Sequence, residues 1–462
     1  MSAEVDTHSG ARPEPVDRHG SGTAGARPVR RDAGSVGSLV RAAAATFATQ
    51  IGVGIVALAH IVVVARALGP AGRGELVFLT TTAGLAGFVA TLSAHEGLAN
   101  QAGADPARRG VLVANAAGLA LVLGGLGGLA LFTLLGPLQL FAIVGDQAAA
   151  AAAAAAVPGV VAFSYLTYLT RADHAFGVAN RALLAVSVSL FAGDTALAVV
   201  GELTVRRAVT IWALSYPVGC APLVRHLLRS HGIRRPDLGL AGASVRFGLK
   251  AHGAGLLNTG SYRMDTWLLG ALAGAGPLGI YSVAVAWFET LFLLPTAYAA
   301  VARPGIVEAD LDEVGERTES AFRLALIGVI AAGVGLALLA PVVCGRLFGP
   351  DYAAAATELR LLVPGAMGIA AVKVLGGALT ARGRPVLETL GVAAGFAVGA
   401  VAYLVLIPRF AAEGAAVATS LSYLTGGAAT AVVFVRAVGN GFSALIPTRG
   451  DLTALSRLIR RS

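Results

Sequence analysis

The chain has 462 residues, of which 56% are hydrophobic and 13% are charged, and its mean hydropathy is +0.74. A soluble domain needs about 25% charged residues to cover its surface, so this composition excludes an ordinary soluble protein. Apolar segments of about 20 residues, the length of a membrane-spanning helix, recur along most of the chain. Because the alternating pattern of a barrel strand is absent, we expect an all-α polytopic membrane protein.

Residues 1–37 precede the first apolar segment and are rich in Gly, Arg, Pro, Ser and Asp. This composition predicts a disordered tail, and without an apolar core it does not resemble a cleavable signal peptide. The hydropathy of the rest predicts twelve spans. They lie at about 41–65, 75–97, 110–134, 148–170, 181–200, 208–228, 246–270, 278–302, 320–341, 355–379, 387–407 and 413–435.

The 35 lysine and arginine residues are divided unequally between the loops that these spans leave. With the N-terminus inside, 26 lie on the cytoplasmic side, seven, including Arg66 and Arg73, on the outer side, and two, Arg263 and Lys373, within spans. Cytoplasmic loops carry the excess of basic residues, so we expect a cell-membrane protein with both termini in the cytoplasm. The same distribution accounts for the net charge of +9 without nucleic acid as a partner.

An internal repeat divides the spans into two sets of six. ALGPAGRGELVF aligns with ALAGAGPLGIYSV and places Gly74 on Gly279, an offset of 205 residues. LTRADHAF matches LTARGRPV, and ALSY matches SLSY, in the same order at offsets of 210 and 207. These matches predict two parallel six-helix repeats around a central cavity. The glycine-rich stretch is then the turn between the first two spans, where Pro70 stops the first helix.

We therefore divide the chain into five parts. The disordered tail is followed by two lobes joined by a cytoplasmic linker, and the chain ends in a second basic tail. The boundaries are 1–37 for the first tail, 38–229 for the N-lobe, 230–244 for the linker, 245–436 for the C-lobe and 437–462 for the basic cytoplasmic tail.

ARALGPAGRGELVF resembles the first-hairpin signature of the polysaccharide (oligosaccharide-lipid) flippases, a family of the multidrug/oligosaccharidyl-lipid/polysaccharide exporter (MOP) superfamily. Three later stretches resemble the same family in the same order. They are RMDTWLLGALAGAGPLGIYSVAVAWFETLFLLP at 263–295, LFGPDYAAAATELRLLVPG at 347–365 and LIPRFAAEGAAVATSLSYL at 406–424. The resemblance covers about residues 40–436, and its motifs are more specific for the superfamily than for a substrate.

The resemblance implies a secondary transporter, not an enzyme, whose central cavity opens alternately to each side of the membrane. The implied substrate is a polyprenyl-pyrophosphate-linked oligosaccharide, which is moved to the outer leaflet for cell-surface glycan biosynthesis. Glycan polymerases and glycosyltransferases are then candidate partners. Anionic membrane lipids are a further candidate, because Arg225, Arg229, Arg234 and Arg235 form a basic cluster. We expect no cofactor or metal.

The span at 246–270 carries the polar residues that we expect to bind substrate. A charge at mid-membrane costs about 2.5–3.5 kcal/mol, so Arg263 is expected to face a cavity or a partner. Its guanidinium suits a pyrophosphate, although an ion pair with Glu289 or Asp265 is the alternative. Asn258 and Tyr262 lie on a polar stripe of the same helix. Lys373 either joins this cavity or extends its side chain to the membrane surface.

Four residues are candidates for ion coupling. Asp265 and Glu289 occupy positions that resemble acidic positions of the family, where a carboxylate either couples an ion or locks helices together. His60 and Asp194 are lone polar residues in other spans. A histidine titrates near neutrality and can carry a proton, although a hydrogen bond between helices is the simpler interpretation.

Other functions remain open at this point. A small-molecule or multidrug cation antiporter and a lipid II flippase belong to the same superfamily. A structural component of a glycan-export complex is also compatible with the sequence. A membrane glycosyltransferase or polymerase is disfavoured because no loop carries paired carboxylates. An ATP-driven pump is disfavoured because no GxxxxGK[ST] motif occurs in the sequence.

Overall fold

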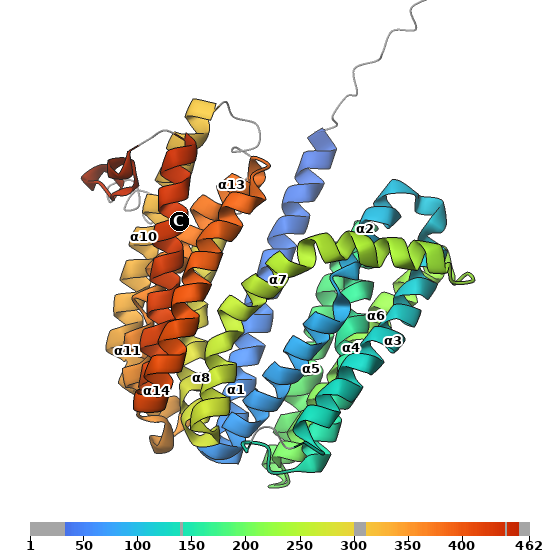
Figure 1. The fold of residues 1–462 in the computed structure, drawn as a ribbon, viewed down its shortest axis with the longest axis horizontal. Helices are drawn as coiled ribbons and strands as arrows, with labels where there is room; N and C mark the ends of the chain where they lie inside the picture. The colour runs from blue at the N-terminus through green and yellow to red at the C-terminus, as the bar shows by residue number, and fades with distance from the viewer. Residues whose placement is uncertain (1–32, 139–141, 300–310, 439–440, 452–462) are drawn as a thin grey trace, which may run out of the picture. The chain divides into compact units, whose positions relative to one another are not determined.

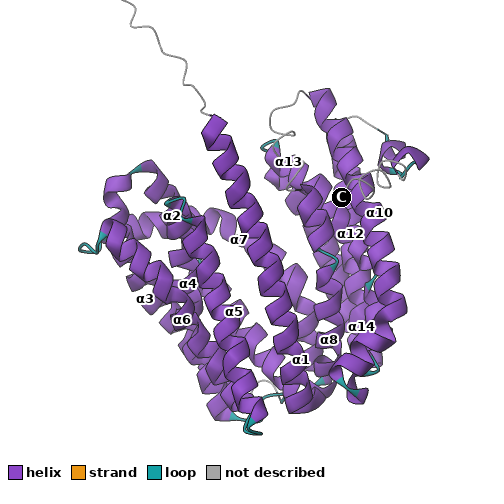
Figure 2. Ribbon diagram, turned by 180° about the vertical axis from the view of Figure 1, so that it is seen from behind, coloured by secondary structure: helices purple, strands orange, loops and turns teal. Residues whose placement is uncertain are grey.

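The computed structural model describes residues 33–138, 142–299, 311–438 and 441–451. Nearly all of these residues are helical, and no strand occurs among them (Figure 2). The chain divides into a segment that ends at Ala44 and a compact body that begins at Ala45. The predicted tail at 1–37 lies mostly outside the described residues, and the first helix begins within it, at Ala33.

The helices follow one another with short connections (Figure 1). Those of the first half are α1 (Ala33–Thr91), α2 (Ala94–Ala104), η1 (Pro106–Arg108), α3 (Arg109–Leu135), α4 (Gln147–Ala172), α5 (Phe176–Val199) and α6 (Val205–His231). Those of the second half are α7 (Leu238–Ala273), α8 (Ala275–Thr290), α10 (Leu311–Ala340), η2 (Pro341–Arg346), η3 (Pro350–Tyr352), α11 (Ala355–Leu362), α12 (Gly365–Ala371), η4 (Val372–Gly376), α13 (Gly377–Ala381), α14 (Pro385–Val438) and η5 (Phe442–Leu445).

Seven described helices are long and apolar enough to cross a membrane, or eight if the bent pair 350–362 and 365–381 is one span. Two of the seven each contain two helices, because α1 is broken at Gly69 and α14 at Ala411. The more polar α6 and α7 add two, since their 27 and 36 residues exceed the length of a span. The described part of the chain thus accommodates the twelve predicted spans.

The internal repeat is visible in the backbone. Gly69 has φ 66° and ψ 178°, and Gly274, which lies 205 residues later, has φ 85° and ψ −173°. Gly201 and Ala411, which are 210 residues apart, also have positive φ. Glycine adopts this conformation at little cost, so the turn predicted at Gly69 and Pro70 has its physical reason in Gly69. The fold therefore consists of two parallel six-helix repeats, which we call the N-lobe and the C-lobe.

The two lobes meet closely at one end of the body. A Cβ atom on Gly74 would overlap the carbonyl oxygen of Ala275, and one on Gly279 would overlap that of Pro70. Nearby, the Tyr352 hydroxyl donates a hydrogen bond to the carbonyl of Ala65 at 3.0 Å. We call this region, formed by residues 65–74, 274–279 and 346–352, the closed end.

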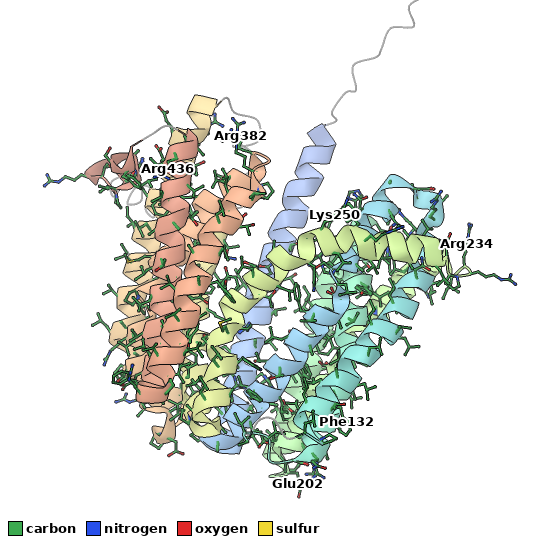
Figure 3. All side chains as sticks on the ribbon, viewed as in Figure 1. Phe132, Glu202, Arg234, Lys250, Arg382 and Arg436 are labelled. Atoms are coloured by element: carbon green, nitrogen blue, oxygen red, sulfur yellow. The ribbon has the colours of Figure 1, made fainter. Side chains whose placement is uncertain are left out.

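Basic residues gather at the opposite end of the body. Figure 3 shows Arg234, Lys250, Arg382 and Arg436 at that end, whereas Glu202 lies at the end where the lobes meet. Near Glu202, Arg206 Nε donates to Asp146 Oδ2 at 2.7 Å and links the starts of α6 and α4. This hydrogen bond lowers the pKa of the Asp146 carboxyl below its ordinary value. The stability that this hydrogen bond contributes is therefore present above the ordinary pKa of an aspartate. It is lost as the pH falls through the lowered pKa that Asp146 has in the folded protein.

Helix α7 connects the lobes and begins earlier than predicted. It starts at Leu238, within the predicted linker at 230–244, because the Asp237 side chain accepts a hydrogen bond from Leu240 N at 3.1 Å. Its first turns pack on α2, where Ser93 Oγ lies 3.0 Å from Nδ1 of His252. Its last turns belong to the C-lobe, so α7 crosses from one lobe to the other (Figure 1).

We expect Gly279→Val to separate the lobes at the closed end, because the new side chain would overlap the Pro70 carbonyl. Spin labels at the exposed positions Ala71 and Asp351, one in each lobe, would report a longer mean distance by double electron–electron resonance. Gly276→Val is the matched control, since a Cβ there meets nothing within 4 Å. An unchanged distance in Gly279→Val would contradict the assignment of this crossing as the contact that holds the lobes together.

Candidate functional site

A central cavity lies between the lobes next to the closed end. It consists of two adjoining parts of about 490 and 450 Å³. Both parts are lined by α1 of the N-lobe and α7 of the C-lobe, and they share Arg73 and Arg263. A third space of about 360 Å³, which we call the C-lobe pocket, is lined by Asn258, Thr259, Tyr262, Arg263, Glu289, Phe292 and Lys373.

Arg263 borders all three spaces. Its side chain is 45% exposed, although it lies in the middle of a membrane helix, because it faces the cavity and not lipid or core. Its Nη1 lies 3.2 Å from Oε1 of Glu289 on α8. Of the two acidic partners considered from sequence, Glu289 is therefore the one that forms the ion pair. The guanidinium keeps further N–H groups available for a ligand in the cavity.

The other three predicted substrate-binding residues lie around Arg263. Lys373 Nζ is 5.2 Å from the centre of the Tyr262 ring, a cation–π distance, and both residues line the C-lobe pocket with Asn258. Lys373 lies in η4, a π-helical turn, and such turns often occur at functional sites because they redirect side chains. Lys373 thus faces the pocket and does not extend to the membrane surface.

Asp265 lies apart from these residues. It is 3% exposed and accepts a hydrogen bond of 2.7 Å from the Tyr281 hydroxyl. That hydroxyl lies 3.0 Å from Thr419 Oγ1, which in turn lies 3.1 Å from the Tyr403 hydroxyl. The chain of hydroxyls joins α7, α8 and α14 inside the C-lobe. Asp265 and Glu289, predicted as a set, are therefore divided between a buried network and the cavity wall.

His60 and Asp194, which the sequence presents as lone polar residues, form a pair. Nε2 of His60 on α1 is 2.6 Å from Oδ2 of Asp194 on α5, and the two side chains are only 11% and 1% exposed. Both residues line the second part of the central cavity together with Arg73 and Arg263. Oδ1 of Asp194 is buried and has no hydrogen-bond partner among the described residues. This arrangement can hold a proton between an imidazole and a carboxylate at the edge of the cavity.

Arg73 lines the central cavity, whereas the predicted spans put it in an outer loop, which is wrong. The second helix begins directly after Gly69, so residue 73 lies within it and its side chain is buried. Its Nε donates to Ser282 Oγ of the C-lobe at 3.2 Å. The internal repeat indicated the buried position of residue 73, because this residue aligns with Leu278, an apolar residue that is fully buried.

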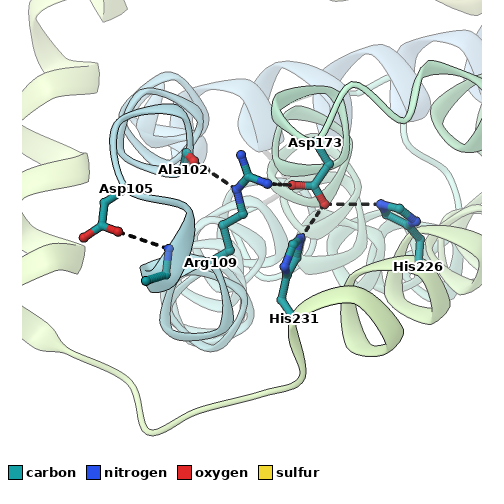
Figure 4. A network of polar contacts seen from close by, with 7 residues as sticks. Ala102, Asp105, Arg109, Asp173, His226 and His231 are labelled. Carbon is teal, nitrogen blue, oxygen red and sulfur yellow. Dashed lines mark hydrogen bonds and ion pairs between the residues drawn. The ribbon is translucent and has the colours of Figure 1, made fainter.

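A second polar network lies at the basic end of the N-lobe (Figure 4). Asp173 accepts from His231 Nε2 at 2.6 Å and from His226 Nε2 at 3.2 Å, and lies 3.0 Å from Arg109 Nη1. Arg109 Nε also donates to the carbonyl of Ala102. The network joins the ends of α2, α3, α4 and α6. None of its residues lines the central cavity, so its role is to connect these helices.

Two six-helix repeats around a polar cavity, built from helices that are long and apolar enough to cross a membrane, define the class of the protein: it is a polytopic helical membrane protein. No protein-family model matches the sequence, and no curated protein matches it either. Solved structures do. The lipid II flippase MurJ, in an inward closed conformation, matches with a TM-score of 0.70 and 12% identity over 86% of this chain and 88% of MurJ.

Multidrug transporters of the MATE family show the same fold. An inward-facing structure of one matches with a TM-score of 0.67 and 15% identity, over 84% of this chain and 94% of that one. A MOP superfamily transporter from Pyrococcus furiosus, described as having a binding pocket of reverse polarity, matches with a TM-score of 0.59 and 15% identity, over 85% and 94% of the two chains. The chain therefore has the fold of the MOP superfamily transporters.

The buried network of the C-lobe predicts a stability effect. Tyr281→Phe removes the hydroxyl that donates to the buried Asp265 carboxylate, and we expect a loss of about 1–3 kcal/mol. Thermal unfolding of the purified protein in detergent would measure it. Tyr168→Phe is the control, because within the described part of the chain Tyr168 makes a ring contact with His95 and no hydrogen bond. Equal melting temperatures for the two variants would argue against the network.

Proposed function

We propose that this protein flips a polyprenyl-pyrophosphate-linked oligosaccharide from the cytoplasmic to the outer leaflet by alternating access. The observation that carries the proposal is the charge of the cavity. Arg73 and Arg263 line the central cavity, and Lys373 lines the adjoining C-lobe pocket. The carboxylates that line these spaces are Glu289, paired with Arg263, and Asp194, paired with His60, so three fixed cations stand against two carboxylates. A low-dielectric space with excess positive charge favours an anion and opposes a cationic drug.

The pyrophosphate would occupy the cavity beside Arg263. A phosphate oxygen can accept charge-assisted hydrogen bonds from a guanidinium, which stays ionised when desolvated. Lys373, which lines the C-lobe pocket with Arg263, adds a second positive charge. Asn258 and Tyr262 provide hydrogen-bonding groups and an aromatic face for the sugar hydroxyls and rings. The lipid tail would remain in the membrane outside the lobes.

The orientation of the protein is part of the proposal. The end with Arg234, Lys250, Arg382 and Arg436 would face the cytoplasm, by the positive-inside rule, with both termini on that side (Figure 3). The closed end would then face outward in the plasma or inner membrane. The N-lobe at 38–229 and the C-lobe at 245–436 would move as units, so that the closed end opens while the opposite end closes. Anionic lipids at the cytoplasmic surface and enzymes that build or polymerise the glycan would be the partners.

Coupling to a proton gradient or to the membrane potential would supply the driving force. His60 and Asp194 are the best-placed group, because they form a nearly buried pair at the cavity edge. Glu289, which shares the cavity with Arg263, and the buried Asp265 are the other candidates. Two alternatives fit the same fold: a lipid II flippase, which shares the pyrophosphate chemistry, and a multidrug cation antiporter, which does not.

Flipping in liposomes tests the proposal. Purified protein is reconstituted with polyprenyl-pyrophosphate oligosaccharide, with lipid II or with a cationic dye, and a membrane-impermeant lectin or quencher reports the leaflet. We expect transport of a pyrophosphate lipid, slowed about ten- to a hundredfold by Arg263→Ala through loss of charge-assisted hydrogen bonds. Arg409→Ala, at an exposed position outside the cavity, should transport normally. Transport of the dye alone would favour the cation antiporter.

A second experiment addresses coupling. Asp194→Asn keeps the shape of the side chain but removes the charge that pairs with His60. We expect this variant to retain flipping down a substrate gradient and to lose acceleration by an imposed proton gradient. Asp146→Asn serves as the control, since that carboxylate lies outside the cavity, in an ion pair with Arg206. Full acceleration in Asp194→Asn would exclude this pair as the proton site.

A further inference from the structure

Arg73 is a buried cation that has no carboxylate within ion-pair distance among the described residues. It is 7% exposed, and among the described residues its guanidinium donates a hydrogen bond to Ser282 Oγ alone. A guanidinium has five N–H donors, and a buried charge without a counter-charge is costly. The fold therefore keeps at this position a cation whose hydrogen-bonding capacity is largely unused by the described residues.

The architecture does not require a charge at this position. The repeat aligns residue 73 with Leu278, which is fully buried and apolar. Both residues directly precede the glycines at which the lobes cross, Gly74 and Gly279. The same backbone arrangement is thus built with a leucine in one lobe and an arginine in the other, so the arginine calls for an explanation other than packing.

The position of Arg73 relates it to the cavity. It lines both parts of the central cavity from the N-lobe, and Arg263 lines the same two parts from the C-lobe. Because Gly74 lies against Ala275 at the lobe crossing, Arg73 stands where the cavity meets the closed end. An anion that leaves Arg263 toward that end would meet Arg73 next.

The bond to Ser282 is suited to exchange. It joins the lobes, yet Ser282 does not depend on it, since its hydroxyl already donates to the carbonyl of Gly279 at 2.7 Å. A neutral hydroxyl is also a weaker acceptor for a guanidinium than a phosphate oxygen, because charge-assisted hydrogen bonds are roughly twice as strong. A phosphate-type anion can therefore replace Ser282 as the partner of Arg73.

We propose that Arg73 is a second anion-binding position, at the closed end of the cavity, which binds the diphosphate of the substrate in exchange for Ser282. The exchange removes a contact between the lobes beside the Gly74 crossing, so that arrival of the anion itself favours opening of the closed end. This inference rests on the proposed function. It adds a second anion-binding position and a cause for the opening of the closed end.

Inorganic pyrophosphate is the probe, used with the full-length purified protein. Binding is measured by isothermal titration calorimetry, and opening by the distance between spin labels at Ala71 and Asp351. Arg73→Leu copies the residue of the other repeat and is expected to fold, which its melting temperature verifies. We expect about tenfold weaker pyrophosphate binding and no distance change on binding. Arg73→Lys should restore part of the affinity.

Ser282→Ala separates binding from release. It removes the protein partner but keeps the arginine, so we expect unchanged or tighter pyrophosphate binding and a longer label distance at lower concentrations of pyrophosphate. If Arg73→Leu folds and binds pyrophosphate as tightly as the unmodified protein, the inference is wrong. It is also wrong if pyrophosphate binds at Arg73 and the label distance stays constant.

Failure of this inference differs from failure of the proposed function. Pyrophosphate binding that is lost in Arg263→Ala but retained in Arg73→Leu would overturn only the second anion-binding position. An unmodified protein that binds no pyrophosphate, and whose liposomes flip no pyrophosphate lipid, would overturn both.

Discussion

The backbone crossing at Gly74 and Gly279 is the contact on which the rest of the structure depends. Because neither residue has a side chain, the starts of two helices approach to backbone distance and close one end of the space between the lobes. The two glycines are equivalent positions of the repeat, so the crossing is nearly symmetric, as expected for two parallel repeats. Without it, the starts of these helices would separate, and the space that contains Arg73 and Arg263 would lose the contact that closes it at this end.

Within that cavity, electrostatics separates the roles of the two lobes. The C-lobe wall carries Arg263, Lys373 and a carboxylate that offsets only part of their charge. The N-lobe wall carries Arg73 and the His60–Asp194 pair. In a low-dielectric space such charges interact more strongly than at a surface. In the function we propose, protonation of the N-lobe pair would therefore change the field at an anion on the C-lobe wall, and proton and substrate would be coupled through space without direct contact.

The sequence was sufficient for the fold and for part of the site. Hydropathy predicted the spans, and the 205-residue offset predicted the turn that the structure has at Gly69 and again at Gly274. It also predicted that Arg263, Lys373, Asn258 and Tyr262 carry polar function, and all four meet in one pocket. It could not pair His60 with Asp194, since 134 residues separate them and no periodicity encodes which helices touch. It placed Arg73 in an outer loop, because the predicted second span begins at residue 75, whereas the backbone break at Gly69 starts that helix four residues before Arg73.

The two repeats share a backbone and differ in chemistry, and in the function we propose that difference would give transport its direction. A strictly symmetric pair of lobes would bind an anion equally from both walls and would have no preferred sequence of contacts. Here Leu278 takes the place of arginine in one repeat, and the buried Asp265–Tyr281 network stiffens the lobe that carries Arg263. In the function we propose, the C-lobe would hold the anion at Arg263. The N-lobe would contribute the residues that change state, Asp194 by protonation and Arg73 by exchange of Ser282 for the anion, so motion of the N-lobe relative to a fixed C-lobe site would be the simplest way for this asymmetry to drive transport.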